Sequence, residues 1–193
     1  MNARSALETS GFAILRGVLD VRILDGMRGR ALADVQKGTM DDDGLNRGYP
    51  IKASEYLALI DSVDAIMVRE GIVPERLEDA MLIPKLAGEK RRYWHTDAKP
   101  VRAQNGPCSD VFALCYLEDT SIENGCLVVG VADDRFLHAA ETEYAERIEG
   151  EIPVPVRIGD LIVLDYRWPH GAYANQTEQD RLMIRLQIEL KGD

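Results

Sequence analysis

The feature that most constrains the fold is an alternation of apolar and polar residues near the end of the chain, over residues 181–190, in which only Met183 breaks the polar set. The sequence there is RLMIRLQIEL, with leucine or isoleucine at every second position. A period of two places the two sets on opposite faces of a β-strand. We expect the apolar face to pack on a core against N-terminal helices. The polar face has two interpretations: exposure to solvent, which is usual in antiparallel sheets, or the interior of a barrel, where arginines would point into one cavity.

Short apolar or alternating runs recur from about residue 78, which favours a β architecture for the second part of the chain. Turn residues separate them, as at 105–107, 124–125 and 159–160. The segment ADDRFLHAAETEYAERIEG interrupts the series and is predicted to be partly helical. The predicted strands are EDAMLIPKL, DVFALCYLE, GCLVVGV, IPVPVRI, DLIVLDY and RLMIRLQIEL.

The first part of the chain is predicted to be mostly helical. Residues 5–36 read as helix, strand and helix, with GFAILRG as the strand, and residues 37–50 read as a glycine- and aspartate-rich loop. A long amphipathic helix is predicted over 54–71, with Ser54 as its N-cap. Helices followed by many short strands predict a β-sandwich or barrel with helices against one face.

Length and charge narrow the class of protein. A chain of 193 residues is expected to form one domain, with a mostly helical part over 1–77 and a β core over 78–193. The net charge of −10 argues against binding to nucleic acid or to an anionic membrane surface. The chain has no apolar run of membrane-spanning length and no signal-peptide pattern, so we expect a cytoplasmic protein. The three cysteines have no CxxC spacing and are expected to be free thiols, with Cys115 and Cys126 buried.

The chain holds only three histidines, and two of them come at strands or strand ends of the β part. His95 precedes Asp97 by two residues in RRYWHTDAKP, and His170 follows the strand DLIVLDY. Residues two apart in a strand point to one face, so this imidazole and this carboxylate can bind one ion. With His170 they form the set of two histidines and one carboxylate that holds Fe(II) in non-haem oxygenases. The alternative is structural, since the HxD triplet is short and a lone histidine is often a satisfied structural residue, as we expect for His138.

Arg181 is a candidate partner for a carboxylate group near these three residues. It lies at the start of the last predicted strand, after His170. A guanidinium group can form a bidentate pair with a carboxylate. A dicarboxylate cosubstrate such as 2-oxoglutarate needs such a partner at its distal end, so Arg181 is a candidate cosubstrate-binding residue.

The ordered segments of the chain resemble the phytanoyl-CoA dioxygenase-like family of Fe(II)/2-oxoglutarate-dependent oxygenases. The opening LETSGFAILRGVLDVRILDGMRGRALADV is similar to the family's first strand and helix, and LIPKLAGEKRRYWHTD to its lysine-bearing strand before HxD. YLEDTSIENGCLVV and IGDLIVLDYRWPHGAYANQTEQDR resemble the segments that follow, ending in the distal histidine, an asparagine and an arginine. Together they span most of the chain in the family's order.

The resemblance implies a double-stranded β-helix, a cupin-like jelly roll, with the N-terminal helices packed on one face. It implies His95, Asp97 and His170 as the catalytic iron ligands, and Arg181 as the clamp for the C5 carboxylate of 2-oxoglutarate. Lys85 matches a family position that can contact the cosubstrate, with an ordinary surface lysine as the alternative. The implied cofactors are Fe(II), 2-oxoglutarate and O2, and the products from the cosubstrate are succinate and CO2.

The same resemblance indicates where a small-molecule substrate would bind and how it would react. In this fold the polar face of the last strand points inward, so Arg185 is predicted to line the pocket and to meet an anionic group. Tyr93, Tyr116 and Trp168 are further candidates for the pocket wall. Halogenating relatives have a small residue at the position of Asp97, so the carboxylate here predicts hydroxylation of a C–H bond or a related oxidation.

Two alternatives stay open from the sequence. One is a cupin-like metal protein, an isomerase or lyase, that acts without 2-oxoglutarate; the other is a non-catalytic metabolite-binding protein. The chain departs from many relatives after NGCL, where VVGVADDRFLH replaces a Pro-Gly-Ser-His turn. The sequence does not identify the primary substrate or the oligomeric state.

Overall fold

The computed structural model describes residues 2–37, 48–97, 108–131, 133–142, 144 and 146–192. The helices are α1 (Ala3–Ser10), α2 (Val21–Lys37), α3 (Leu57–Arg69) and α4 (Asp134–Glu141), with a short 3-10 helix η1 (Ala53–Glu55). The strands are β1 (Phe12–Leu15), β2 (Tyr49–Pro50), β3 (Pro74–Lys85), β4 (Arg92–His95), β5 (Asp110–Tyr116), β6 (Leu127–Val129), β7 (Ile152–Val154), β8 (Leu161–Asp165), β9 (His170–Ala172) and β10 (Arg181–Leu190).

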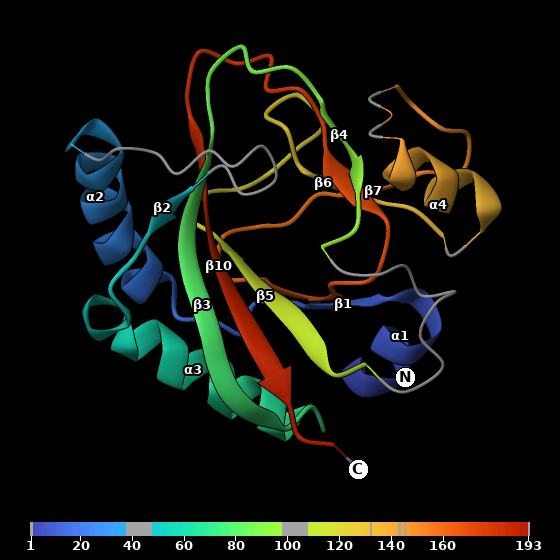
Figure 1. The fold of residues 1–193 in the computed structure, drawn as a ribbon. Coiled ribbons are helices and arrows are strands. Elements are labelled where there is room, and N and C mark those ends of the chain that lie inside the picture. The colour runs from blue at the N-terminus through green and yellow to red at the C-terminus, as the bar shows by residue number, and fades with distance from the viewer. Residues whose placement is uncertain are drawn as a thin grey trace.

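The strands form two antiparallel sheets that face each other (Figure 1). One sheet has six strands in the order β1-β8-β5-β10-β3-β2, and the other has four in the order β4-β9-β6-β7. Strands that are neighbours in a sheet are mostly far apart in the chain, which is the pairing of a double-stranded β-helix. The predicted jelly roll is therefore confirmed.

The long strand β10 lies in the middle of the six-stranded sheet, between β5 and β3, and its two faces meet different surroundings. Its apolar face packs with buried residues of α1, α2 and α3, as predicted, through Leu182, Ile184, Leu186 and Ile188. Figure 1 shows α2 and α3 beside β3 on the outer side of this sheet. The other face carries Arg181, Met183 and Arg185 toward the space between the sheets, so the barrel interpretation is correct for these residues.

The segment after β6 contains α4, which packs against the four-stranded sheet. Trp94, Cys126 and Val128 from that part of the fold form a small core with Phe136 of α4. The Trp94 and Phe136 rings meet edge to face, with centroids 4.9 Å apart. This core supports the sheet that carries both pocket histidines.

Three sequence predictions need correction or lie beyond the described chain. Ser54 does not cap a helix: the turn at 53–55 is a 3-10 helix, and α3 begins after Tyr56 without a side-chain cap. The predicted strand IPVPVRI shortens to Ile152–Val154 at the edge of its sheet, because proline has no N–H to continue the pairing. The loop predicted over 37–50 falls mostly outside the described residues, and its last two residues form β2.

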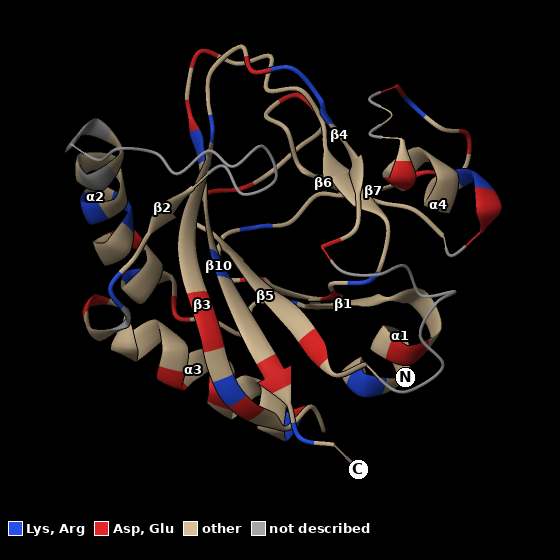
Figure 2. Cartoon of the chain, viewed as in Figure 1, with Lys and Arg blue, Asp and Glu red and all other residues tan. Residues whose placement is uncertain are grey.

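The cysteines are free thiols as predicted, and the charged residues of β3 gather at one end of the strand (Figure 2). No described helix is long and apolar enough to cross a membrane. The cysteines are free, and Cys115 and Cys126 are buried. The charged residues of β3 gather toward its N-terminal end, away from Lys85, as Figure 2 shows.

Candidate functional site

The two histidines are brought together by strand pairing. His95 ends β4, His170 begins β9, and the two residues are direct partners in the antiparallel register. Their ring centroids lie 4.3 Å apart. Asp97 lies beyond the end of β4, where its N–H donates to Tyr166 O at 2.9 Å. The HxD triplet is thus half strand and half loop, and does not form the continuous strand that the sequence suggested.

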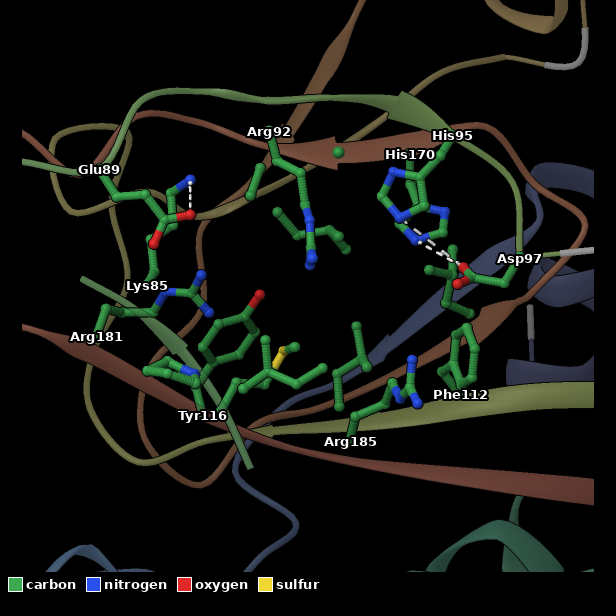
Figure 3. A pocket seen from close by; sticks show the side chains of 18 residues that line it. Lys85, Glu89, Arg92, His95, Asp97, Phe112, Tyr116, His170, Arg181 and Arg185 are labelled. Carbon is green, nitrogen blue, oxygen red and sulfur yellow. Dashed lines mark hydrogen bonds and ion pairs between the residues drawn. The ribbon is translucent and has the colours of Figure 1, made fainter. Parts of the chain in front are cut away.

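The carboxylate of Asp97 points at both imidazoles (Figure 3). Its Oδ2 lies 3.2 Å from His170 Nε2 and 4.0 Å from His95 Nε2. One ligand atom from each of the three residues falls within 4.8 Å of the others. Among the described residues, this is the group of histidine, cysteine or carboxylate side chains that can hold a metal ion.

Backbone carbonyls fix the tautomer of each ring. His95 Nδ1 lies 3.1 Å from Tyr93 O, and His170 Nδ1 lies 2.9 Å from Trp168 O. A carbonyl only accepts, so each Nδ1 carries a proton and donates, and each Nε2 presents a lone pair to Asp97. Carbonyl contacts of this kind orient metal-binding histidines in proteins.

The charges of the three side chains favour a bound cation. Burial and the neighbouring His170 lower the pKa of His95 to about 3, so its imidazole is neutral. Asp97 Oδ2 is buried and makes no hydrogen bond within the described chain. Two nitrogen lone pairs and a carboxylate that face one another fit a divalent metal with open positions for other ligands.

Arg181 lies across the cavity from this group, at the first position of β10. Its side chain is buried, and its guanidinium carbon stacks 5.0 Å from the centre of the Tyr116 ring. The Nε and Nη1 atoms are buried without a hydrogen-bond partner among the described residues. A buried guanidinium with two such donors fits a carboxylate group of a ligand.

Lys85 is the direct strand partner of Arg181, at the last position of β3. It is buried, which lowers its pKa, although the nearby Glu89 opposes the shift. Its Nζ donates to Glu89 Oε1 at 3.0 Å and to the carbonyl of Lys90. Lys85 therefore lines the cavity and also holds the loop that follows β3.

Asn175 fixes this end of the cavity from the other side. Its Nδ2 donates to Lys85 O at 3.0 Å and to Gln179 O at 2.8 Å. Its Oδ1 accepts from the backbone N–H and the hydroxyl of Thr177. The amide thus joins the end of β3 to the turn that leads into Arg181.

Two further arginines reach the cavity. Arg185 was predicted from its place on β10, and its guanidinium carbon lies 4.7 Å from the centre of the Phe112 ring. Arg92 was missed, because strand alternation puts residues 92 and 95 on opposite faces. An irregularity in the pairing of β4 with β9 between them turns Arg92 to the pocket side, and Figure 3 shows it reaching into the middle of the cavity.

The glycine after His170 lets the two strands come this close. A side chain at Gly171 would meet Arg92 O at 3.0 Å and Tyr93 O at 3.1 Å. Both contacts are with backbone, which cannot move aside without disturbing β4. Gly171 therefore permits the approach of β9 to β4 on which the histidine pair depends.

The aromatic candidates divide into one residue in the pocket wall and two outside it. Tyr116 lines the cavity beneath Arg181. Tyr93 and Trp168 are not among the lining side chains, and Trp168 Nε1 donates to Gly130 O at 2.8 Å. Their contribution comes from the carbonyl groups that hold the histidine rings, which side-chain patterns in the sequence do not reveal. His138 is exposed on α4 and takes no part in the site.

Comparison with known proteins adds a family and a set of shared folds. The sequence model described as phytanoyl-CoA dioxygenase (PhyH) matches residues 33–183. No curated protein matches the chain.

Several solved structures share the fold at low sequence identity. HygX from Streptomyces hygroscopicus, with nickel, 2-oxoglutarate and hygromycin B bound, is 19% identical over 97% of this chain and 86% of its own, with a TM-score of 0.68. The α-ketoglutarate-dependent epimerase SnoN from nogalamycin biosynthesis is 19% identical over 97% of this chain and 81% of its own, with a TM-score of 0.72. The carbocyclase SnoK from nogalamycin biosynthesis is 18% identical, covers 97% and 83% of the two chains, and has a TM-score of 0.72.

Proposed function

The chain belongs to the phytanoyl-CoA dioxygenase family, and from this premise we propose that it is an Fe(II)- and 2-oxoglutarate-dependent oxygenase acting on a small molecule. The observation that carries the proposal is the convergence of His95, Asp97 and His170, with both Nε2 lone pairs facing one carboxylate oxygen. The buried guanidinium of Arg181 across the same cavity supports 2-oxoglutarate as the cosubstrate.

In this proposal the residues of the cavity divide between the metal and the cosubstrate. His95, Asp97 and His170 hold Fe(II), and Arg181 binds the distal carboxylate of 2-oxoglutarate. When bound, the metal supplies the redox chemistry by which 2-oxoglutarate and O2 become succinate and CO2 while the substrate is oxidised. Lys85 holds Glu89 at the end of the cavity that contains Arg181. We propose that it also contacts the distal carboxylate of 2-oxoglutarate.

The protein also controls orientation and water. The carbonyl groups of Tyr93 and Trp168 keep the Nδ1 protons in place, so both rings present Nε2 to the metal. Aromatic and aliphatic side chains from both sheets line the rest of the cavity, among them Phe112, Leu114 and Leu127. Such a lining limits the access of water and strengthens the charged contacts made inside.

We propose hydroxylation of a C–H bond as the outcome, because the Asp97 carboxylate is present as a third ligand. Solved structures that share this fold include an epimerase and a carbocyclase as well. Product analysis is therefore part of the test: incorporation of oxygen from O2 into the product supports hydroxylation, and an oxidised product without added oxygen supports a related oxidation. We also propose that residues 1–193 act as one domain.

The decisive experiment is anaerobic addition of Fe(II) and 2-oxoglutarate to the purified chain. Formation of the weak visible charge-transfer band of the chelate, followed by succinate release when O2 is admitted, is the expected result. A cupin-like isomerase or lyase predicts turnover without O2, and a binding protein predicts no succinate at all. Absence of the band at saturating Fe(II) and 2-oxoglutarate would contradict the proposal even before a substrate is known.

A further inference from the structure

The cavity contains two similar pairs of an arginine and an aromatic ring, formed between the neighbouring strands β10 and β5. On β10 the inward side chains include Arg181 and Arg185, and on β5 they include Tyr116 and Phe112. Each guanidinium lies over one ring: Arg181 at 5.0 Å from the centre of Tyr116, and Arg185 at 4.7 Å from the centre of Phe112. Stacking on an aromatic ring holds a guanidinium flat and directs its edge N–H groups along the plane.

The spacing of the two arginines means that one cosubstrate cannot use both. Four residues along a strand span about 13 Å. A five-carbon dicarboxylate that is chelated at one end can reach only one of these groups with the other end. Under the proposed function, on which this inference rests, Arg181 takes that role and Arg185 is left for another ligand.

The surroundings of the two arginines support this division. Lys85, Glu89 and Asn175 enclose the Arg181 end through their mutual hydrogen bonds. Arg185 instead pairs with Asp79 on β3, Nη2 to Oδ2 at 3.1 Å, and the Asp79 side chain is 44% exposed. Figure 3 shows Arg185 and Phe112 on the Asp97 side of the cavity, whereas Arg181 and Tyr116 lie on the side of Lys85 and Glu89.

Arg185 is a built site and not a surface charge. Its side chain is 8% exposed, and besides Asp79 its Nη2 contacts Met81 Sδ at 3.0 Å. A thioether is a weak acceptor, so this donor gains from a carboxylate oxygen in its place. The contact to Asp79 is at the solvent-exposed edge, where an incoming anion can exchange with it or join it.

The charge of the cavity points in the same direction. Among the described lining residues, the cations outnumber the carboxylates: Lys85, Arg92, Arg181 and Arg185 against Glu89 and Asp97. Fe(II) and 2-oxoglutarate together add no net charge, and Asp79 at the rim offsets one of the two excess positive charges. Since unbalanced charge is unfavourable in a cavity of low polarity, a second anion is favoured there.

We propose that the primary substrate is a carboxylic acid, and that Arg185 on Phe112 binds its carboxylate beside the metal site. This makes Arg185 the residue that determines substrate class. It also restricts the reacting C–H bond to one within a few carbons of the acid group, because Arg185 and Asp97 lie on the same side of the cavity.

The test compares the binding affinity of a carboxylic acid with that of the uncharged amide of the same shape. The full chain, loaded with Fe(II) and 2-oxoglutarate without O2, is titrated with phenylacetate and with phenylacetamide in a calorimeter, while the chelate band is followed. We expect phenylacetate to bind about 10- to 100-fold more tightly than phenylacetamide, as a charged hydrogen-bonded pair would give. Arg185→Gln should remove this preference and leave the band and the 2-oxoglutarate affinity unchanged.

Two further variants make the result specific. Arg76→Gln removes the same charge from an arginine that is 67% exposed on β3, and should leave the preference intact. Asp79→Asn removes the competing carboxylate and should strengthen binding of phenylacetate without affecting the amide. Should Arg185→Gln not fold, as judged by its melting curve, Asp79→Asn decides alone, and unchanged or weaker acid binding overturns the proposal.

The outcomes separate this inference from the proposed function. Equal binding of acid and amide, or no binding of either at the solubility limit, overturns the inference while a normal chelate band leaves the oxygenase proposal in place. Loss of the band on adding phenylacetate also overturns it, since the acid would then compete for the site of 2-oxoglutarate. A missing band in the wild-type chain, with the acid preference retained, overturns the oxygenase proposal and leaves Arg185 as an anion site.

Discussion

At the scale of single residues, Asp97 has a carboxylate oxygen that no hydrogen bond within the described chain satisfies. Its Oδ2 atom is buried, and it faces two imidazoles whose Nδ1 protons are directed to backbone carbonyl groups. Only a cation between the three groups, or a proton taken from solvent, satisfies it. We therefore expect Fe(II) binding to depend strongly on Asp97.

Replacement of Asp97 by alanine should therefore abolish succinate release and weaken Fe(II) binding by at least about 100-fold, more than the loss of an outer contact to a metal ligand. An anaerobic Fe(II) titration against a competing chelator measures the affinity. His138→Ala is the matched control, because this third histidine is exposed on α4 and should leave both quantities unchanged. Wild-type succinate release by Asp97→Ala would rule out the assigned ligand set.

Arg181 acts on the cosubstrate and not on the metal. Arg181→Gln should raise the 2-oxoglutarate concentration needed for half-maximal succinate release by about 10- to 100-fold, and Arg181→Lys by less, because an ammonium group cannot pair in a bidentate way. Iron affinity should stay near that of the wild type, since Arg181 lies across the cavity from the histidines. An unchanged requirement for 2-oxoglutarate, or a loss of iron, would contradict the assignment.

Residues whose side chains follow a simple period could be predicted from the sequence, and residues displaced by an irregularity could not. His95, Asp97, His170 and Arg181 were named from spacing and chemistry, and the structure brings them to one cavity. Arg92 escaped notice because the irregularity in β4 reverses the face on which it lies. The carbonyl groups of Tyr93 and Trp168 have no signal in the sequence at all, since every residue carries one.

At the scale of elements, the segment after β6 is held to the four-stranded sheet by one carboxylate and its partners. The carboxylate of Glu151 joins this segment to the four-stranded sheet, and it is nearly buried. It accepts from Arg91 at 2.6 Å, from Arg147 at 2.9 Å and from the Tyr173 hydroxyl at 2.5 Å. Arg91 in turn lies over the Tyr173 ring, so charge and stacking hold the segment together.

Glu151→Ala should lower the free energy of unfolding by about 2–3 kcal/mol, because it leaves the mostly buried Arg91 without its carboxylate. Arg147→Ala removes a partner that is 70% exposed and should change stability by less than about 0.5 kcal/mol. Denaturant unfolding of the three proteins gives both values. Equal losses in the two variants would show that burial of the pair is unimportant.

The pH dependence of this effect has a defined sign. Burial raises the pKa of Glu151, but the hydrogen bonds from Tyr173 and Arg91 outweigh it, and the net shift is downward. A carboxyl group with a lowered pKa in the folded state stabilises the fold above its ordinary pKa and loses this effect as the pH falls. The stability difference between wild type and Glu151→Ala should therefore narrow under acid conditions.

The sequence predicted this segment to be partly helical, and α4 confirms that prediction. The sequence did not predict that the segment packs against the four-stranded sheet. The helix was visible in its local pattern, whereas its contacts with Trp94 and Cys126 connect residues distant in the chain. The same holds for the first part of the chain. Its strand GFAILRG was predicted and is confirmed as β1, which pairs with β8 at one edge of the six-stranded sheet, whereas β2, which pairs with β3 at the other edge, lies where a loop was predicted. Short strands that depend on distant partners carry little local signal.

At the scale of the whole molecule, the proposed ligands connect the two sheets. The histidines belong to the four-stranded sheet, and Arg181 and Lys85 belong to the six-stranded sheet. A cosubstrate that is bound to the metal at one end and to Arg181 at the other would link the sheets across the cavity. Fe(II) alone would stabilise mainly the four-stranded sheet, which carries the two histidines.

Thermal unfolding without O2 tests this link. Ligands that bind only the folded state stabilise it by about 2.7 kcal/mol at 100 times their dissociation constant, which for a chain of this length is a rise of about 5–10 °C in Tm. We expect Fe(II) and 2-oxoglutarate together to give such a rise, and 2-oxoglutarate alone to give little. Asp97→Ala should respond to neither addition, whereas Arg181→Gln should keep the response to Fe(II) and lose the increment from 2-oxoglutarate. A full increment in Arg181→Gln would mean that the cosubstrate does not bridge the two sheets through this residue.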